Sequence, residues 1–388
     1  MKYEHIEIEL EQFSKQPGMP CGDVFYRKKT EQHTTIILSD GKGHGVKANI
    51  AATMNVAYLV KLLDTGFSPR AAFFKLIEMH KKTGSDGCHY SVFSIARILN
   101  DGVATLLTYE MPPPIFISPR GAKILDQRKI DFNDSEIFEA NCYLKNNEAI
   151  MLMSDGITQA GVGRGYASAN MNNIGWGSEN LCKFINEKIS SQIDYSKLSK
   201  EIIAEVFKIC QQNRDDDISS VIAYSRYGNV SNVWTGPPTD KTLDGKYIQK
   251  FQNAKGYKII CGGTTANIFA KNLNRTMEVC TALANPFTPP QYKIDGIDLA
   301  TEGAVTLNQL YNIIGEKRSL MKDESPVTQL YDYLMTSDKI IFYLGSVNSH
   351  SATDIDLIQR GIKSRRDIVP LIAEKLREIG KLVVVEWI

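Results

Sequence analysis

Two short stretches of the sequence end an apolar run in the same three residues: serine, aspartate and glycine. The first is IILSDG, which contains Asp40 and Gly41, and the second is IMLMSDG, which contains Asp155. An aspartate at the end of a buried strand is held rigidly, and a following glycine permits a tight bend that lets its carbonyl face the same point. Carboxylate and carbonyl oxygens are the ligands that hard divalent cations prefer. The two stretches therefore predict halves of one metal site, although a single Asp-Gly pair is more typical of a β-turn.

Two further acidic positions can join such a site. The stretch NRDDDISSVIAY places Asp215, Asp216 and Asp217 directly before an apolar run, and CGDVF contains Asp23. Each has a simpler interpretation, because runs of acidic residues also occur in solvated loops. Carboxylates that lie close together repel one another unless cations neutralise them, so their convergence would itself favour bound metal.

The segments around these acids predict a mixed fold over residues 1–226. Short β-rich runs alternate with pairs of helices, expected at 46–65 with 68–82 and at 178–190 with 195–212. Helices grouped beside antiparallel strands are typical of an α+β fold. The spacing that indicates the first helix comes from Ile50, Met54, Ala57 and Tyr58.

The second half of the chain has a different order of expected strands and helices. The polar, turn-rich segment Tyr227–Asp240 is interpreted as an interdomain linker, which gives domains at 1–228 and 238–388. Strands and helices alternate after it and predict a smaller α/β domain of regulatory or ligand-binding role. Within it, Gly262–Thr265 joins a strand to a helix start. That stretch is suited to an anion, although a plain strand-to-helix turn is the favoured interpretation.

The bulk composition excludes several classes of partner. The chain of 388 residues has 45 basic and 44 acidic residues, hence a net charge of +1, which favours neither nucleic acid nor an anionic membrane. The N-terminal stretch is too charged for a signal peptide, and no apolar run approaches the ~20 residues that span a bilayer. Seven separated cysteines contain no Cys-x-x-Cys pair. We therefore expect a cytoplasmic protein with reduced thiols.

The order of the acidic motifs resembles a known family. Gly-Asp, Ser-Asp-Gly-x-Gly-x-Gly, Met-Ser-Asp-Gly and Asp-Asp-Ile-Ser follow one another over about residues 20–226. The same order is found in metal-dependent (PPM-type) protein serine/threonine phosphatases, in the branch of the sporulation stage II E (SpoIIE-type) phosphatase. The resemblance implies an α-β-β-α sandwich of two antiparallel sheets flanked by helices. It also implies a centre of two divalent metal ions, Mn²⁺ or Mg²⁺, in a cleft at one end.

The resemblance assigns roles to individual residues. The implied metal ligands are Asp23, Asp40, Gly41, Asp155 and Asp216. Asp40 bridges both ions in this scheme, and the Gly41 carbonyl binds one of them. Asp216 is preferred to Asp217 because the family pattern places the ligand two residues before Ile218. Asp40 and Asp155 are also the implied catalytic residues.

The sequence departs from the eukaryotic type-2C members of the family. Lys42 follows the Asp-Gly pair where those enzymes have a histidine, and the histidine is displaced to His44. His44 is therefore either a general acid or phosphate ligand, or a surface histidine. No upstream arginine stands where those enzymes hold the substrate phosphate, and Arg27 and Lys28 are poor substitutes. The phosphate is accordingly expected to rest on metal alone.

These features predict a bacterial phosphatase that acts in signal transduction. A metal-bridging hydroxide would hydrolyse phosphoserine or phosphothreonine on a small regulatory protein, such as an anti-sigma-factor antagonist. Two alternatives stay open: a catalytically inactive interaction module that keeps the fold, and a hydrolase of small phosphomonoesters or nucleotides. The intact acidic set argues against the inactive module. The sequence leaves the oligomeric state open. The helix pair at 46–82 is implied to be a regulatory switch, or else packs as two plain helices.

Overall fold

The computed structural model describes residues 3–83, 90–162, 175–213, 215–280, 288–321, 324–345, 359 and 361–388. Most of the glycine-rich stretch at 161–177 lies outside these ranges. The chain divides into two compact units. The N-terminal unit contains Glu4–Lys28 and Gln32–Arg226, and the C-terminal unit contains Tyr227–Ile388 with Met1–Tyr3 and Lys29–Glu31.

Two antiparallel sheets form the centre of the N-terminal unit. The first contains, in spatial order, β1 (Glu4–Phe13), β11 (Ile218–Tyr227), β10 (Ala149–Met153), β6 (Ile115–Ser118) and β7 (Gly121–Ile124). The second contains β2 (Asp23–Lys29), β3 (His33–Gly41), β4 (Ser91–Leu99), β5 (Val103–Tyr109), β9 (Ser135–Tyr143) and β8 (Arg128–Phe132).

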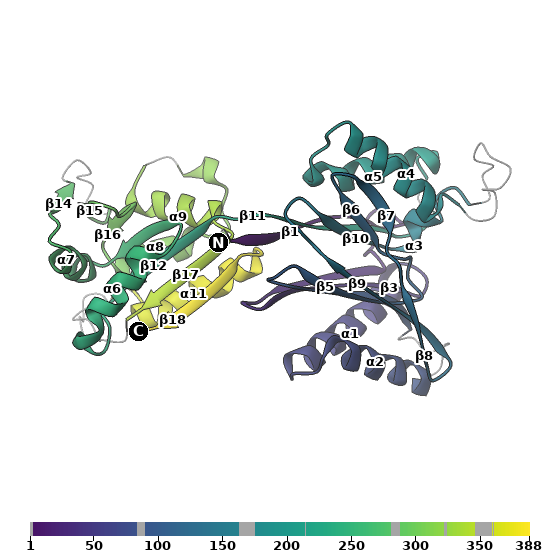
Figure 1. The fold of residues 1–388 in the computed structure, drawn as a ribbon, viewed down its shortest axis with the longest axis horizontal. Coiled ribbons are helices and arrows are strands. Elements are labelled where there is room, and N and C mark those ends of the chain that lie inside the picture. Colours follow the sequence, from purple (N-terminus) through teal and green to yellow (C-terminus); the bar gives the residue numbers. More distant parts are fainter. Residues whose placement is uncertain are drawn as a thin grey trace. The chain divides into compact units, whose positions relative to one another are not determined.

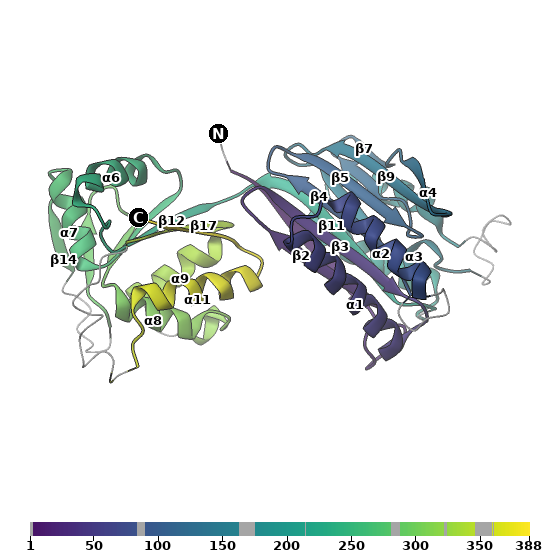
Figure 2. The same ribbon diagram turned by 90° about the horizontal axis from the view of Figure 1, so that it is seen from below.

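Pairs of helices cover the outer faces of these sheets (Figures 1 and 2). Helices α1 (Gly45–Asp64) and α2 (Pro69–Thr83) pack on the second sheet, and α4 (Gly177–Ser190) and α5 (Tyr195–Ile209) pack on the first. The N-terminal unit is therefore the α-β-β-α sandwich that the motif order implies, and the predicted fold is confirmed.

The apolar runs before the two Ser-Asp-Gly motifs are explained by burial on both faces of each strand. In β3, Ile36 and Leu38 face the core between the sheets, whereas Ile37 faces the helices α1 and α2. In β10, Ile150 likewise faces the core between the sheets and Met151 faces α4 and α5. A strand packed on both sides needs apolar residues at every position, so no alternation is visible in the sequence.

The first half of helix α1 packs through small side chains rather than through its large apolar ones. Ala48, Ala51 and Ala52 are buried against the sheet. Ile50 and Met54, whose spacing indicated the helix, are 49% and 48% exposed. Because alanine side chains are short, the helix backbone lies close to the strand that carries Asp40.

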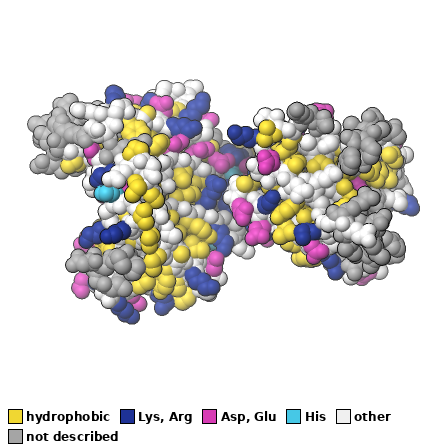
Figure 3. Space-filling view, turned by 180° about the vertical axis from the view of Figure 1, so that it is seen from behind, with side chains coloured by type: hydrophobic (Ala, Val, Ile, Leu, Met, Phe, Trp, Pro, Cys, Tyr) yellow, Lys and Arg dark blue, Asp and Glu magenta, His cyan; other side chains and the backbone are white. Residues whose placement is uncertain are grey.

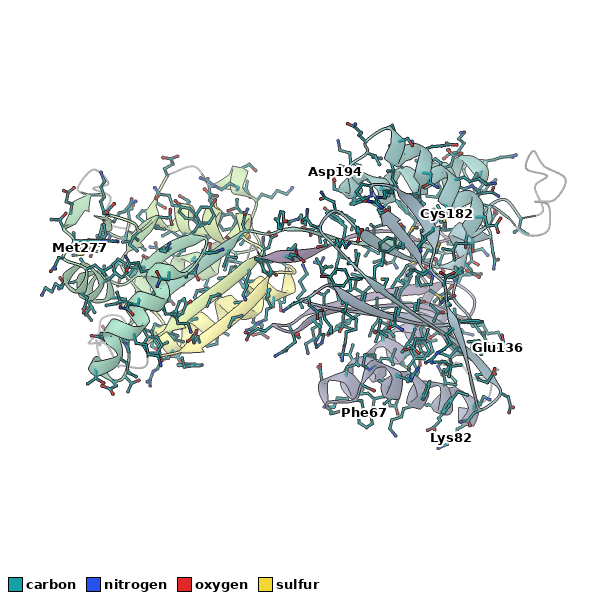
Figure 4. All side chains as sticks on the ribbon, in the orientation of Figure 1. Phe67, Lys82, Glu136, Cys182, Asp194 and Met277 are labelled. Atoms are coloured by element: carbon teal, nitrogen blue, oxygen red, sulfur yellow. The ribbon has the colours of Figure 1, made fainter. Side chains whose placement is uncertain are left out.

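The start of α5 shows local sequence and structure in agreement. Asp194 is the N-cap, and its carboxylate accepts a hydrogen bond of 3.0 Å from the backbone N–H of Ser196 (Figure 4). This bond satisfies one of the backbone donors left open by the first helical turn. Leu198, Ile202 and Val206 then follow at helical spacing and are fully buried against the first sheet.

The C-terminal unit is an α/β layer structure built on one mainly parallel sheet. Its spatial order is β14 (Met277–Cys280), β15 (Gln291–Ile294), β16 (Leu299–Thr301), β13 (Tyr257–Cys261), β12 (Val230–Thr235), β17 (Lys339–Leu344) and β18 (Leu382–Trp387). Helices α6 (Asp244–Asn253) and α7 (Gly263–Asn272) pack on one face. Helices α8 (Ala304–Ile313), α9 (Pro326–Thr336) and α11 (Arg365–Glu378) pack on the other.

The interpretation of Tyr227–Asp240 as a linker is wrong for its middle part. Residues Val230–Thr235 form β12, a central strand that pairs in parallel with β13 and β17. Ser231 and Asn232 made this stretch look like a loop, but both are buried and hydrogen-bonded. The Ser231 hydroxyl pairs with that of Ser337 at 2.8 Å, and the Asn232 amide donates to the Lys255 carbonyl at 2.9 Å.

The surface carries charges of both signs. On the face shown in Figure 3, basic and acidic side chains are interspersed on each unit. Within the described ranges, no helix is both long and apolar enough to cross a lipid bilayer.

The two faces of α1 predict unequal responses to truncation. Leu59 is fully buried, so Leu59→Ala should lower the free energy of unfolding by about 2–5 kcal/mol. Ile50→Ala on the half-exposed face should change it by less than about 1 kcal/mol. Chemical denaturation followed by circular dichroism measures both values. Equal losses in the two variants would contradict the orientation of the helix.

A buried histidine on α2 predicts acid sensitivity. His80 is 3% exposed and packs near the rings of Tyr90, Phe93 and Tyr109, and this burial lowers the pKa of His80 to about 4. The unfolded chain, with a pKa near 6.5, binds the proton first. Stability contributed by neutral His80 is therefore lost as the pH falls from about 6.5 toward 4.

The non-titrating variant His80→Gln tests this link. Between pH 6 and pH 5, its free energy of unfolding should fall less steeply than that of the wild type, by up to about 1.4 kcal/mol per pH unit. Denaturation curves at the two pH values provide the slopes. Identical slopes for the two proteins would show that His80 is not a source of the acid sensitivity.

Candidate active site

One hollow in the N-terminal unit gathers most of the predicted site residues. It has a volume of about 480 Å³, and Asp40, Gly41, His44, Asp155 and Asp216 all line it. These residues come from three separate parts of the sequence. The structure therefore brings together the two Ser-Asp-Gly motifs and the acidic run at 215–217.

The ends of strands from both sheets position these carboxylates. Asp40 and Gly41 are the last residues of β3, and Asp155 begins the short helix α3 (Asp155–Thr158) directly after β10. Asp216 lies in the turn before β11, which is the antiparallel neighbour of β10 with Met153 opposite Ser220. Each acid therefore stands on a rigid element at the same end of the sandwich.

Asp23 lies behind the wall of the hollow rather than on it. Its side chain is 1% exposed, and its Oδ2 accepts a hydrogen bond of 2.6 Å from the Ser219 hydroxyl. Its Oδ1 has no hydrogen-bond partner among the described residues. A buried carboxylate oxygen without a donor is unfavourable unless a cation or water meets it.

Burial and mutual repulsion raise the pKa values of the carboxyl groups in the acidic cluster. Burial and the neighbouring charges of Asp23, Asp155 and Asp216 raise the pKa of Asp40 to about 10. Burial raises the pKa of Asp23 to about 7, and burial also raises the pKa values of Asp155 and Asp216. Asp155 Oδ2 accepts a hydrogen bond of 2.7 Å from the side-chain amide of Gln159. Such a cluster of acids is poised to exchange protons for divalent cations.

The glycines of the two motifs are required by close backbone contacts. A Cβ atom on Gly41 would lie 2.0 Å from the carbonyl oxygen of Ala48 in α1. A Cβ atom on Gly156 would lie 2.1 Å from the carbonyl oxygen of Asp217. Neither position can carry any other residue without backbone displacement, so the motif glycines do more than form turns.

The serines of the two motifs fix the strand ends. The Ser39 hydroxyl pairs with the Ser91 hydroxyl of β4 at 2.8 Å. The Ser154 hydroxyl accepts a hydrogen bond of 2.9 Å from the backbone N–H of Ser219 on β11. Both serines are fully buried, and each connects the strand before a site aspartate to its neighbour in the sheet.

Other residues of the hollow were not identified from the sequence. Lys15, Tyr90 and Glu110 line it beside the acids. The Tyr90 hydroxyl donates a hydrogen bond of 2.7 Å to Glu110, whose backbone adopts a left-handed conformation with φ of 54°. These residues lie far from the acidic motifs in sequence, and no local pattern marks them.

The structure separates the three consecutive acids before β11. Asp216 lines the hollow, whereas Asp217 is 3% exposed and its Oδ1 accepts a hydrogen bond of 2.8 Å from the backbone N–H of Lys15. His44 is the exposed N-cap of α1 and makes no capping hydrogen bond with its side chain. Its role as a general acid stays a prediction, as does the ligand role of each acid.

Comparisons with known proteins found several similar solved structures. Two solved structures similar to this chain are the RsbU and RsbW domains of Rv1364c from Mycobacterium tuberculosis, and the PP2C phosphatase domain with a fragment of the regulatory domain of SpoIIE from Bacillus subtilis. The first has 14% identity and a TM-score of 0.48, and covers 65% of this chain and 68% of that chain. The second has 16% identity and a TM-score of 0.49, and covers 59% of this chain. The similarity spans 65% of the second chain, which is less than two thirds of its length.

A third similar structure is the serine/threonine phosphatase of S. agalactiae. It has 14% identity and a TM-score of 0.40, and covers 57% of this chain and 99% of that chain. No curated protein matches the sequence. The model of the family described as stage II sporulation protein E (SpoIIE) matches residues 30–226, which is half of the chain. The protein therefore belongs to the SpoIIE family, whose fold is that of PP2C-type phosphatases.

Proposed function

We propose that the N-terminal unit is a metal-dependent protein serine/threonine phosphatase. The observation that carries this proposal is the convergence of Asp40, Asp155 and Asp216 on one hollow, with Asp23 buried directly behind them. Four carboxylates in one place oppose folding unless cations offset their repulsion. Membership of the SpoIIE family supports the same conclusion.

The residues of the hollow fit two divalent cations such as Mn²⁺ or Mg²⁺. Oxygen donors dominate, as these ions require, and Asp23 Oδ1 is a buried oxygen with no hydrogen-bond partner among the described residues. When bound, two such ions supply a water of lowered pKa and neutralise charge on a phosphoryl group. Asp40 lines the hollow together with Asp155 and Asp216, and it would be the ligand shared by both ions.

The chain's own residues prepare the site for a phosphate ester. Asp40 ends β3, Asp155 follows β10 directly and Asp216 lies two residues before β11, so the positions that cations would occupy depend on these neighbouring strands. His44 stands on the exposed side of the hollow, where it can hold a proton near a leaving oxygen. A phosphorylated serine or threonine side chain is short, and the polar hollow of about 480 Å³ is large enough to admit it.

The substrate we favour is a phosphoserine or phosphothreonine on a small regulatory protein, of the kind exemplified by anti-sigma-factor antagonists. Family membership supports a protein substrate over a nucleotide. The hydrolysis of small phosphomonoesters remains the alternative enzymatic function. An inactive interaction module is disfavoured, because such a protein has no need to keep the acids of both motifs.

For the C-terminal unit we retain the proposal of a regulatory or ligand-binding domain. Its start must move from 238 to include β12, because this strand lies at the centre of the parallel sheet. The parallel strands have the order β16-β13-β12-β17-β18, with helices on both faces. In such doubly wound sheets, ligands bind outside the carboxyl ends of the strands where the order reverses, here beside β12 and β17.

Substitution of the motif aspartates tests the catalytic proposal. Asp40→Asn and Asp155→Asn should each lower kcat/KM for a chromogenic aryl phosphate with Mn²⁺ by at least about 100-fold, since each removes a charge that the cations need. The matched control is Asp101→Asn, because Asp101 also precedes a glycine but lies in the exposed turn between β4 and β5. Its activity should equal that of the wild type.

Comparing substrates then separates the two enzymatic functions. If the physiological substrate is a phosphoprotein, a protein that carries phosphoserine should be hydrolysed with a higher kcat/KM than a nucleoside monophosphate. Wild-type activity in Asp40→Asn, measured on either substrate, would remove the acidic cluster from the mechanism.

Removal of metal should abolish activity and lower stability together. Dialysis against a chelator should eliminate hydrolysis, and Mn²⁺ or Mg²⁺ should restore it. At a free concentration of about 100 times Kd, bound metal should stabilise the folded protein by about 2.7 kcal/mol. Thermal denaturation should show this gain in the wild type and a smaller one in Asp40→Asn. Full activity in the chelator would exclude metal dependence.

A further inference from the structure

The walls of the hollow carry four acidic side chains and two lysines, and the proposed substrate is an anion. Of the two lysines, Lys42 holds its Nζ over the ring of Tyr90, 5.9 Å from the ring centroid. Lys15 is the other positive charge, although it lies eight positions before Asp23 in the sequence and outside every acidic motif. It follows directly on β1, in the connection to β2, and it lines the same hollow as Asp216.

The backbone at Lys15 is held in place by a buried acid. Asp217 is 3% exposed and accepts a hydrogen bond of 2.8 Å from the Lys15 N–H. The strand end before it is anchored by the ring of Phe13, which meets that of Phe207 edge-on at 5.2 Å. A charged acceptor makes a stronger hydrogen bond than a neutral one, so this contact fixes where the lysine side chain begins.

The Lys15 ammonium group is not used elsewhere within the described part of the chain. It forms no ion pair there, and the side chain is half-buried. Its charge lies close enough to Asp216 to oppose the rise in the pKa of that carboxyl, which burial causes. Lys28, by contrast, pairs with Asp64 at 2.6 Å, and neither Lys28 nor Arg27 lines the hollow.

We propose that Lys15 binds the phosphoryl group of the substrate and that Asp217 is the positioning residue that holds Lys15 over the site. The inference rests on the proposed phosphatase function and deepens it. An ammonium group donates charge-assisted hydrogen bonds to non-bridging phosphoryl oxygens. Lys15 thus replaces the arginine that the sequence lacks, and the expectation that phosphate rests on metal alone is revised.

Inorganic phosphate, the reaction product, is the probe that tests this role without turnover. Calorimetry with the full chain and saturating Mn²⁺ gives its Kd. Lys15→Ala should raise that Kd by about 10- to 100-fold, as expected for the loss of a charged hydrogen bond. Lys15→Arg keeps the charge and should stay within about threefold of the wild type. Lys28→Ala is the matched control and should leave the Kd unchanged.

Metal affinity separates phosphate binding from a structural role. The Lys15 charge repels cations and attracts phosphate, so Lys15→Ala should bind Mn²⁺ as tightly as the wild type or more tightly, while it binds phosphate more weakly. A loop that merely collapses would weaken both affinities. If Lys15→Ala weakens the affinities for both Mn²⁺ and phosphate, or leaves the phosphate Kd unchanged, the proposal is overturned.

A double-mutant cycle tests the positioning role of Asp217. Asp217→Asn keeps an oxygen acceptor for the Lys15 N–H and should change the phosphate Kd by less than about threefold. Asp217→Ala removes the acceptor and should weaken phosphate binding, and adding Lys15→Ala should then cause little further loss, because the two residues act through one contact. Fully additive losses would show that Asp217 acts independently of Lys15.

The outcome for the wild type distinguishes this inference from the proposed function. A wild-type protein that neither binds Mn²⁺ nor hydrolyses an aryl phosphate rejects the phosphatase function, and the role of Lys15 with it. A wild-type protein that hydrolyses the ester, while Lys15→Ala retains its phosphate Kd, rejects the role of Lys15 alone.

Discussion

Repulsion between like charges is the constraint around which the N-terminal unit is built. Asp40, Asp155 and Asp216 meet at one hollow with Asp23 behind them, and burial strengthens every interaction among them. No flexible loop could hold such groups together, because it would relax to separate the charges. Each acid instead adjoins a strand of a sandwich whose cores lie on both faces of β3 and β10. Packing energy distributed over the whole sandwich therefore maintains a local arrangement of charges that is unfavourable in itself.

The small residues of the two motifs let neighbouring backbone segments pack closely around the acids. Gly41 and Gly156 allow backbone carbonyls to approach where any side chain would collide. Ser39 and Ser154 stand at strand ends where the preceding residues are apolar. The Ser39 hydroxyl pairs with the Ser91 hydroxyl, and the Ser154 hydroxyl accepts a hydrogen bond from the backbone N–H of Ser219. A buried hydroxyl without a partner would be destabilising, so each serine must stay in register with its neighbour strand. The motif Ser-Asp-Gly is thus an acidic residue flanked by two positional constraints.

The sequence predicted those parts of the structure whose causes are local. Apolar runs that end in Ser-Asp-Gly identified β3 and β10, and the family resemblance carried by the motifs implied the sandwich. Contacts between distant segments decided the rest. Asn232 looked like a loop residue because its partner, the Lys255 carbonyl, is brought to it only by the folded sheet. Lys15 could not be identified from the sequence, because no residue near it in the chain indicates that Asp217 accepts a hydrogen bond from its backbone N–H and holds it beside the acids.

The geometry of the hollow and the position of α1 are not independent. The helix begins four residues after Gly41, and the Ala48 carbonyl occupies the space that a side chain on Gly41 would need. A buried polar chain makes a second connection, in which the Asn55 amide of α1 donates to the Ser91 hydroxyl, which in turn pairs with Ser39 beside Asp40. Displacement of the helix would have to break these buried hydrogen bonds or carry β3 with it. An influence on α1 can therefore alter the arrangement of the acids without any contact with a carboxylate, as expected of a regulatory switch.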